Sequence, residues 1–136
     1  KPERMKKIAE LVLGTPGKKI VVLSALSGTT NTLVAIGANL MAGQKAKAED
    51  EIVALEKHYQ AFVKELFTSD SYQAIGQEIV SRFFIFIRLL AAGQFDNKSY
   101  RELLAQGELI STELFYQHLQ ERKISARLLL SLLSQA

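Results

Sequence analysis

The chain contains no cysteine. This absence excludes disulfide bonds, thiolate metal sites and cysteine nucleophiles, and it is compatible with the cytoplasmic location that we expect. Nor does the chain contain the run of roughly 18 uninterrupted apolar residues that a membrane span needs. Its most apolar stretch, residues 83–90, includes Arg88 and is predicted to form a buried helix. The N-terminus lacks the hydrophobic region of a signal peptide, so neither a membrane nor a secretory role is expected.

The chain also has little net charge. Lys and Arg number 17 against 14 Asp and Glu, and the net charge of +3 is spread along the chain. Because no arginine-rich stripe or alternation of basic and aromatic residues occurs, we expect no nucleic-acid partner. With 48% hydrophobic residues among 136, the composition is that of an ordinary globular protein forming one domain or a large piece of one.

The beginning of the chain is predicted to form half of an α/β unit. Residues 3–13 have apolar positions at helical spacing, and Gly14 and Gly17 flank a turn that should end this helix. Residues 19–23 (KIVVL) form a continuous β-branched run, the pattern of a strand covered on both faces in a parallel sheet. We therefore predict an α/β fold.

The rest of the chain is predicted to be rich in helix. Periodic apolar positions indicate a helix after the loop that follows residue 23, ending at Gly43, and long helices over 48–68 and 71–92. We expect two shorter helices, over 98–105 and 108–121, broken near Gly107. Residues 123–130 are predicted to form a second strand, although their leucine-rich end is equally compatible with a helix.

The hydroxyl-rich loop after residue 23 is the first candidate site. Ser24, Ser27, Thr29 and Thr30 lie between the predicted strand and the next helix, where a helix N-terminus could bind a carboxylate or phosphate. Thr29, Thr30 or Asn31 could instead serve as the N-cap of that helix. Ordinary turn and cap chemistry explains the same pattern, and the spacing alone favours this second interpretation.

The second candidate site is the segment GELIST at residues 107–112. Glu108 is predicted to begin a helix, where the helix dipole stabilises an acid, and capping is the favoured interpretation. Alternatively, Glu108 faces a cavity and binds a substrate ammonium group. His58 and His118 have no partner at metal-ligand spacing and are predicted to be surface residues, so no metal site is expected.

Two segments together resemble the aspartokinases. Residues 20–25 (IVVLSA) with 28–33 (GTTNTL) resemble that family's VVLSAxxGxTNxL, and residues 107–112 with Leu114 and Phe115 resemble GELxSxxLF. The order of the segments agrees, and the similarity extends to about Ala126. The resemblance implies part of an amino-acid-kinase α/β/α sandwich over residues 1–136. The family's first strand, its ATP-binding half and its regulatory ACT domains would be absent from this chain.

The resemblance also implies an activity. Aspartokinases transfer the γ-phosphoryl group of MgATP to the β-carboxylate of L-aspartate, giving 4-phospho-L-aspartate, the first step of lysine, threonine and methionine synthesis. By position, Ser24 and Thr30 match hydroxyl residues of the aspartate site, and Glu108 matches a substrate-binding glutamate. The resemblance further implies ATP and Mg²⁺ as cofactors, bound mainly outside this chain, and a homodimeric full-length protein.

No catalytic residue is expected within the segment, and the isolated chain is expected to be inactive. The alternatives are a non-catalytic helical interaction module and a degenerate amino-acid-kinase relative.

Overall fold

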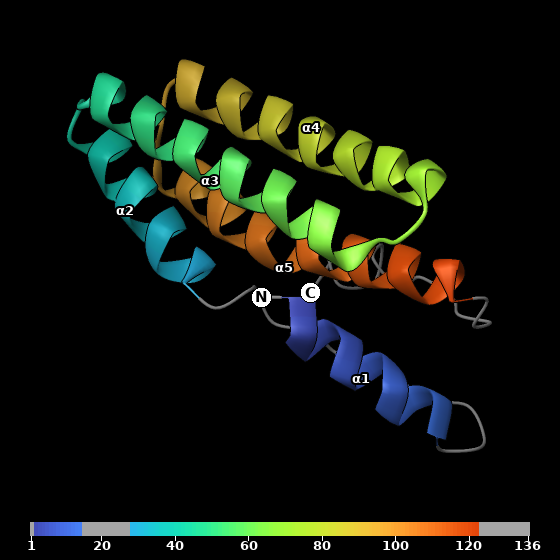
Figure 1. Cartoon of the computed structure of the whole chain (residues 1–136). Coiled ribbons are helices and arrows are strands. Elements are labelled where there is room, and N and C mark those ends of the chain that lie inside the picture. Colours follow the sequence, from blue (N-terminus) through green and yellow to red (C-terminus); the bar gives the residue numbers. More distant parts are fainter. Residues whose placement is uncertain (1, 15–27, 123–136) are drawn as a thin grey trace.

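The computed structural model describes residues 2–14 and 28–122, and every regular element in these ranges is a helix (Figure 1). In chain order the helices are α1 (Pro2–Gly14), α2 (Thr29–Met41), α3 (Lys45–Leu66), α4 (Asp70–Ala92) and α5 (Asn97–Glu121). Within these ranges, no helix combines the length and apolar character needed to cross a membrane.

The predicted α/β sandwich is wrong for the described part of the chain, which is all-α. The predicted strands over 19–23 and 123–130 both lie outside the described residues. The α/β prediction extended one short apolar run to the whole chain, whereas most of the sequence has helical periodicity. The helices predicted over 3–13, 48–68 and 71–92 are confirmed, with small shifts at their ends.

The predicted break at Gly107 is also wrong, because α5 runs through this residue without interruption. A glycine inside a helix costs only about 1 kcal/mol relative to alanine. Here Gly107 lies on the buried face of α5, together with Leu103, Ile110 and Leu114. Tertiary packing of that face outweighs the local preference of one residue.

Helices α2 to α5 form an antiparallel four-helix arrangement. Short connections at residues 42–44, 67–69 and 93–96 reverse the chain between consecutive helices, and α2 also contacts α5. Figure 1 shows α3 and α4 side by side, and α5 packs against α4 as well as α2. Each helix therefore packs its apolar stripe into a shared core, as expected for a helix bundle.

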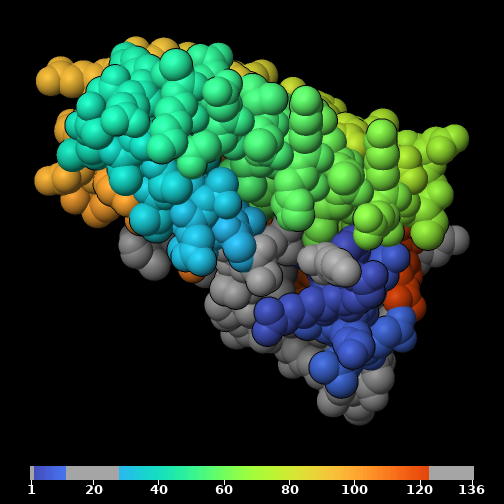
Figure 2. Space-filling model, turned by 60° about the vertical axis from the view of Figure 1, so that its left-hand side comes forward, coloured from blue at the N-terminus to red at the C-terminus, as the bar shows by residue number. Residues whose placement is uncertain are grey.

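Helix α2 is much shorter than its neighbours, and α1 packs farther along the same bundle. With 13 residues, α2 spans roughly 20 Å, whereas the 25 residues of α5 span roughly 38 Å. Figure 2 shows α2 against the first half of α3 and α1 against its C-terminal end. Met5 and Ala9 of α1 are buried, and the Lys6 ammonium donates to the Glu65 carbonyl at 2.9 Å.

The helix starts differ in their capping chemistry. Ser69 accepts from the Tyr72 amide at 3.2 Å, and Asp96 accepts from the Ser99 amide at 2.9 Å, so both serve as N-caps. Helix α2 instead begins after Gly28, whose φ of 85° lies in the left-handed region that favours glycine. Gly28 occupies the N-cap position and provides no side-chain cap, so the predicted caps at Thr29, Thr30 and Asn31 are wrong.

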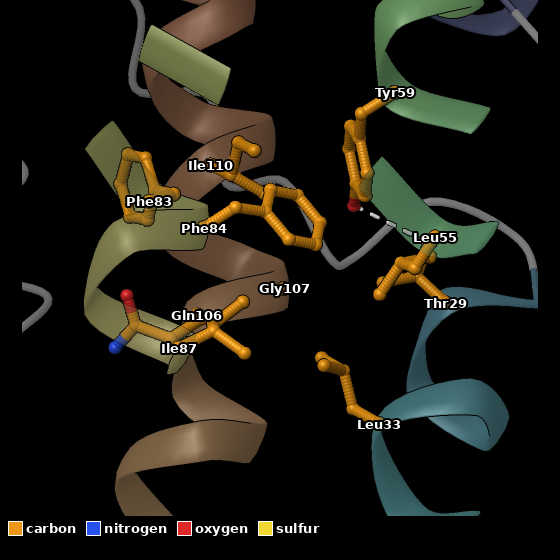
Figure 3. Close-up of a pocket in the computed structure, with 10 residues that line it drawn as sticks. All are labelled: Thr29, Leu33, Leu55, Tyr59, Phe83, Phe84, Ile87, Gln106, Gly107 and Ile110. Atoms are coloured by element: carbon orange, nitrogen blue, oxygen red, sulfur yellow. Dashed lines mark hydrogen bonds between the residues drawn. The ribbon is translucent and has the colours of Figure 1, made fainter. Parts of the chain in front are cut away.

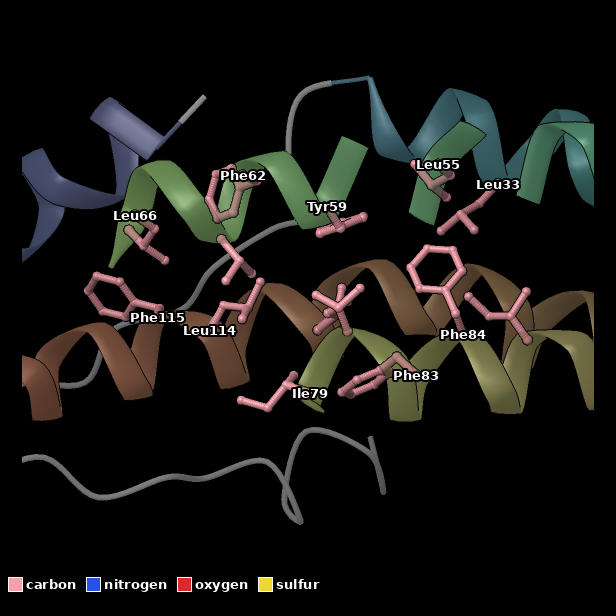
Figure 4. Close-up of a cluster of buried hydrophobic side chains, with 14 of the residues drawn as sticks. Leu33, Leu55, Tyr59, Phe62, Leu66, Ile79, Phe83, Phe84, Leu114 and Phe115 are labelled. Atoms are coloured by element: carbon pink, nitrogen blue, oxygen red, sulfur yellow. The ribbon is translucent and has the colours of Figure 1, made fainter. Parts of the chain in front are cut away.

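Aromatic side chains fill the centre of the bundle (Figure 4). Tyr59, Phe67 and Phe84 are each exposed by 1% or less, and the Tyr59 and Phe84 rings pack with centroids 6.0 Å apart. Figure 4 also shows α1 above Leu66 at one end of the core and α2 above Leu33 at the other. The core is therefore continuous beneath both short helices.

Candidate functional site

A small cavity lies where α2, α3, α4 and α5 meet (Figure 3). It has room for about one water molecule. Most of its lining is apolar, and its polar side chains are those of Thr29, Tyr59 and Gln106. Its backbone wall includes Gly107, so residues of both candidate segments line one cavity.

The polar side chains at this cavity all have hydrogen-bond partners. The Tyr59 hydroxyl donates to Thr29 Oγ1 at 3.2 Å, and both residues are at least 98% buried. Gln106 Nε2 donates to the Glu102 carbonyl at 3.0 Å, within α5. Burial raises the pKa of Tyr59, and the hydroxyls of Thr29 and Ser111 partly offset this effect. The tyrosine is therefore a neutral hydrogen-bond donor at ordinary pH.

Ser111 is the remaining buried hydroxyl near Tyr59. Its side chain is fully buried on α5, and among the described residues its Oγ has no hydrogen-bond partner of normal geometry. It nevertheless lies near enough to influence the Tyr59 hydroxyl. Thr29, Tyr59 and Ser111 thus form a buried hydroxyl cluster contributed by α2, α3 and α5.

The predicted site residues lie at the edge of this region or outside the described chain. Ser24 lies outside the described residues. Thr30 is exposed in the first turn of α2, directly after the cavity residue Thr29. Glu108 is exposed in the middle of α5, directly after the cavity residue Gly107, so the prediction that it begins a helix is wrong. Neither Thr30 nor Glu108 itself lines the cavity.

The two histidines have different surroundings. His58 is exposed, as predicted, whereas His118 is only 3% exposed, so the surface prediction for His118 is wrong. His118 lies on the buried face of α5 and packs edge-on against the Phe67 ring at 6.5 Å. Neither of its ring nitrogens has a hydrogen-bond partner in the described part of the chain.

Burial lowers the pKa of His118. The charges of Arg122 and Lys6 also lower its pKa, and those of Glu121 and Glu10 raise it. The two acids already have other partners. Glu121 accepts from the Ser69 amide at 2.8 Å, and Glu10 forms an ion pair with Arg122.

The described residues do not fit ATP or Mg²⁺. No group of three acidic or histidine side chains within residues 2–14 and 28–122 could hold a metal ion. The cavity is also far too small for a nucleotide. No step involving ATP or Mg²⁺ can therefore be derived from these residues.

Comparison with known proteins confirms the resemblance drawn from the two segments. Over 128 residues, 92% of this chain, the sequence is 32% identical to lysine-sensitive aspartokinase 3 of Escherichia coli. The chain is similar to part of the aspartokinases. It is also 30% identical over 135 residues to chloroplastic aspartokinase 1 of Arabidopsis thaliana. No protein-family model and no solved structure matches the chain.

The similarity covers a limited part of the aspartokinases. The chain spans about a quarter of the length of these relatives, 27% of the bacterial protein and 22% of the plant protein. Most of each relative therefore has no counterpart in the aligned region.

Sequence reasoning missed the hydroxyl cluster. The sequence places Tyr59 only within the predicted helix over 48–68, and Ser111 only within the GELIST segment. One usable signal was present, because a buried tyrosine usually finds a hydrogen-bond partner for its hydroxyl. The partner itself could not be predicted, because Thr29 is 30 residues away in sequence.

Proposed function

We propose that this chain is a non-catalytic helical relative of one segment of the aspartokinases, and that it provides part of a binding site for L-aspartate. One observation carries the proposal. The described residues of the segments that resemble the aspartokinase motifs include parts of two contacting helices, α2 and α5, and Thr29 and Gly107 line one cavity. That residues far apart in the sequence line one cavity supports a shared site formed by their neighbours Thr30 and Glu108.

The proposed roles follow from the chemistry of the residues. Glu108 is exposed and can form an ion pair with the ammonium group of aspartate. Thr30 lies in the first turn of α2, where its hydroxyl and free backbone amides can donate to a carboxylate. Ser24 is proposed as a further hydroxyl donor on the basis of the motif alone.

Aspartate phosphorylation needs more than these groups. Phosphoryl transfer depends on positioning and on neutralising the charge of the triphosphate. The described residues offer no fit for a nucleotide or a metal ion, so we propose that the chain alone does not form 4-phospho-L-aspartate. Incubation with MgATP, aspartate and hydroxylamine should give no aspartyl hydroxamate above the buffer control. Turnover by the purified chain would contradict this part of the proposal.

Calorimetric titration tests the binding role. The chain should bind L-aspartate more tightly than succinate, which has both carboxylates but no ammonium group. Glu108→Gln should abolish this preference, because it removes the charge that recognises the ammonium group. Glu78→Gln is the matched control, since Glu78 is also an exposed glutamate within a long helix. Equal affinity of the native chain for aspartate and succinate would remove Glu108 from the proposed site.

A second candidate function is a helical interaction module. Its support is the exposed apolar surface of α4, where Ile85 is 57%, Phe86 38% and Leu89 67% exposed. Sedimentation over a range of protein concentrations, combined with the aspartate titration, separates the two functions. Association without any aspartate binding would favour the module, and aspartate binding by a monomer would favour the first proposal.

A further inference from the structure

We propose that Tyr59 is a positioning residue for the proposed aspartate site, because its buried hydroxyl bonds to the start of α2 and its side chain lines one cavity with Gly107 and Ile110 of α5. The inference rests on the proposed function, in which Thr30 on α2 and Glu108 on α5 bind one ligand. Tyr59 itself belongs to α3 and to neither motif. It would act through Thr29 rather than by touching aspartate.

The contact with α2 is direct. The Tyr59 hydroxyl donates to Thr29 Oγ1 at 3.2 Å, and Figure 3 shows the two residues on the same side of the cavity. Tyr59 is 1% exposed and Thr29 2% exposed, so water cannot readily replace either partner. Since Thr29 directly precedes Thr30, a shift of the Thr29 backbone would also move Thr30.

Tyr59 meets α5 at the cavity, which is lined by Tyr59, Gly107 and Ile110. Ser111, on the same helix, is fully buried, and its hydroxyl has no hydrogen-bond partner among the described residues. It lies three residues after Glu108, within one helical turn. The same side chain therefore bonds to the first turn of α2 and lines a cavity with the turn of α5 that carries Glu108.

The first turn of α2 depends on this contact more than the later turns do. Its N-cap is Gly28, which provides no side-chain cap. Farther along α2, the Tyr100 hydroxyl donates to the Val34 carbonyl at 3.2 Å, and Asn39 donates to Glu51 of α3. Removing the Tyr59 hydroxyl should therefore loosen the turn that carries Thr30 while the remainder of α2 stays anchored.

Tyr59→Phe tests the inference, and Tyr100→Phe is its matched control. Each substitution removes one phenolic hydroxyl that bonds to α2, but only Tyr59 bonds in the turn that carries Thr30. Circular dichroism should show both variants folded. In calorimetric titrations, Tyr59→Phe should weaken aspartate binding by about tenfold, the scale expected for one buried hydrogen bond. Tyr100→Phe should change the affinity by less than about twofold.

A distance measurement gives a readout that does not depend on aspartate. Because the chain has no cysteine, Thr30→Cys and Glu108→Cys introduce two unique sites for nitroxide labels. Pulsed electron paramagnetic resonance should give a narrow distance distribution for the labelled native background. The distribution should broaden when Tyr59→Phe is added and stay narrow when Tyr100→Phe is added.

The outcomes separate the inference from the proposed function. If the native chain binds no aspartate, the proposed function is overturned, and the aspartate-positioning role of Tyr59 is overturned with it. If the native chain binds aspartate and Tyr59→Phe changes neither affinity nor label distance, only the inference is overturned. Thr29→Val provides a second test from the other partner, because it removes the same hydrogen bond. It should weaken aspartate binding as Tyr59→Phe does, and the double variant should add little.

Discussion

The buried histidine on α5 makes the stability of this protein dependent on pH. His118 is 3% exposed and packs against Phe67, and its ring nitrogens have no hydrogen-bond partner among the described residues. Burial lowers its pKa, so the folded protein holds it in the neutral form. We expect acidification below neutrality to destabilise the fold and His118→Phe to remove this sensitivity.

The sign and size of the effect follow from proton linkage. Between the lowered folded-state pKa and the unfolded value of about 6.5, the unfolded chain binds the proton more readily than the folded chain. The stabilisation is fully present above about pH 6.5 and is lost as the pH falls toward the folded-state pKa. The loss for one group is at most about 1.4 kcal/mol per pH unit. Glu121 and Glu10 offset little of this loss of stability, because both carboxylates already have other partners.

Urea denaturation at pH 7.5, 6.5 and 5.5 measures this dependence. His118→Phe places an apolar ring beside Phe67 and leaves no polar nitrogen unsatisfied, so it should be at least as stable as the native chain at pH 7.5. Its advantage should grow at pH 5.5. His58→Gln replaces the exposed histidine and should keep the native pH dependence. Parallel stability profiles for the native chain and His118→Phe would refute the assignment.

Two further predictions concern packing. A Cβ at Gly76 would lie 2.8 Å from side-chain atoms of Phe67 and Val63. Gly76→Ala should therefore destabilise the fold by about 1–3 kcal/mol, although alanine has a better helix propensity than glycine. Gly93→Ala, where the nearest atom lies at 3.6 Å, should be nearly neutral, and equal unfolding midpoints for these two variants would contradict the packing argument. Leu114→Ala removes a fully buried side chain and should cost about 2–5 kcal/mol in a denaturant titration, so a loss below about 1 kcal/mol would show that the cavity collapses.

The helices that could be predicted from the sequence are those with strong local signals. Helices α1, α3 and α4 have regular apolar spacing, and α4 begins at a serine cap. Helix α2 follows the loop as predicted, but its cap could not be predicted, because the helix begins at the left-handed backbone of Gly28 and not at a capping side chain. The sequence predicts a break in α5 at Gly107 because glycine has a low helix propensity. The packing of the buried face of α5, which keeps the helix continuous, cannot be read from the local sequence.

The sequence by itself determined where helical periodicity occurs and which two motifs resemble the aspartokinases, because both are read over short stretches of chain. Only the tertiary structure decided that Tyr59 joins Thr29, that His118 is buried, and that residues of both motifs line one cavity. The physical reason is that an apolar stripe specifies that a face will be buried but not which face it meets. Partners as distant as residues 29, 59 and 107 are chosen by the packing of the whole bundle.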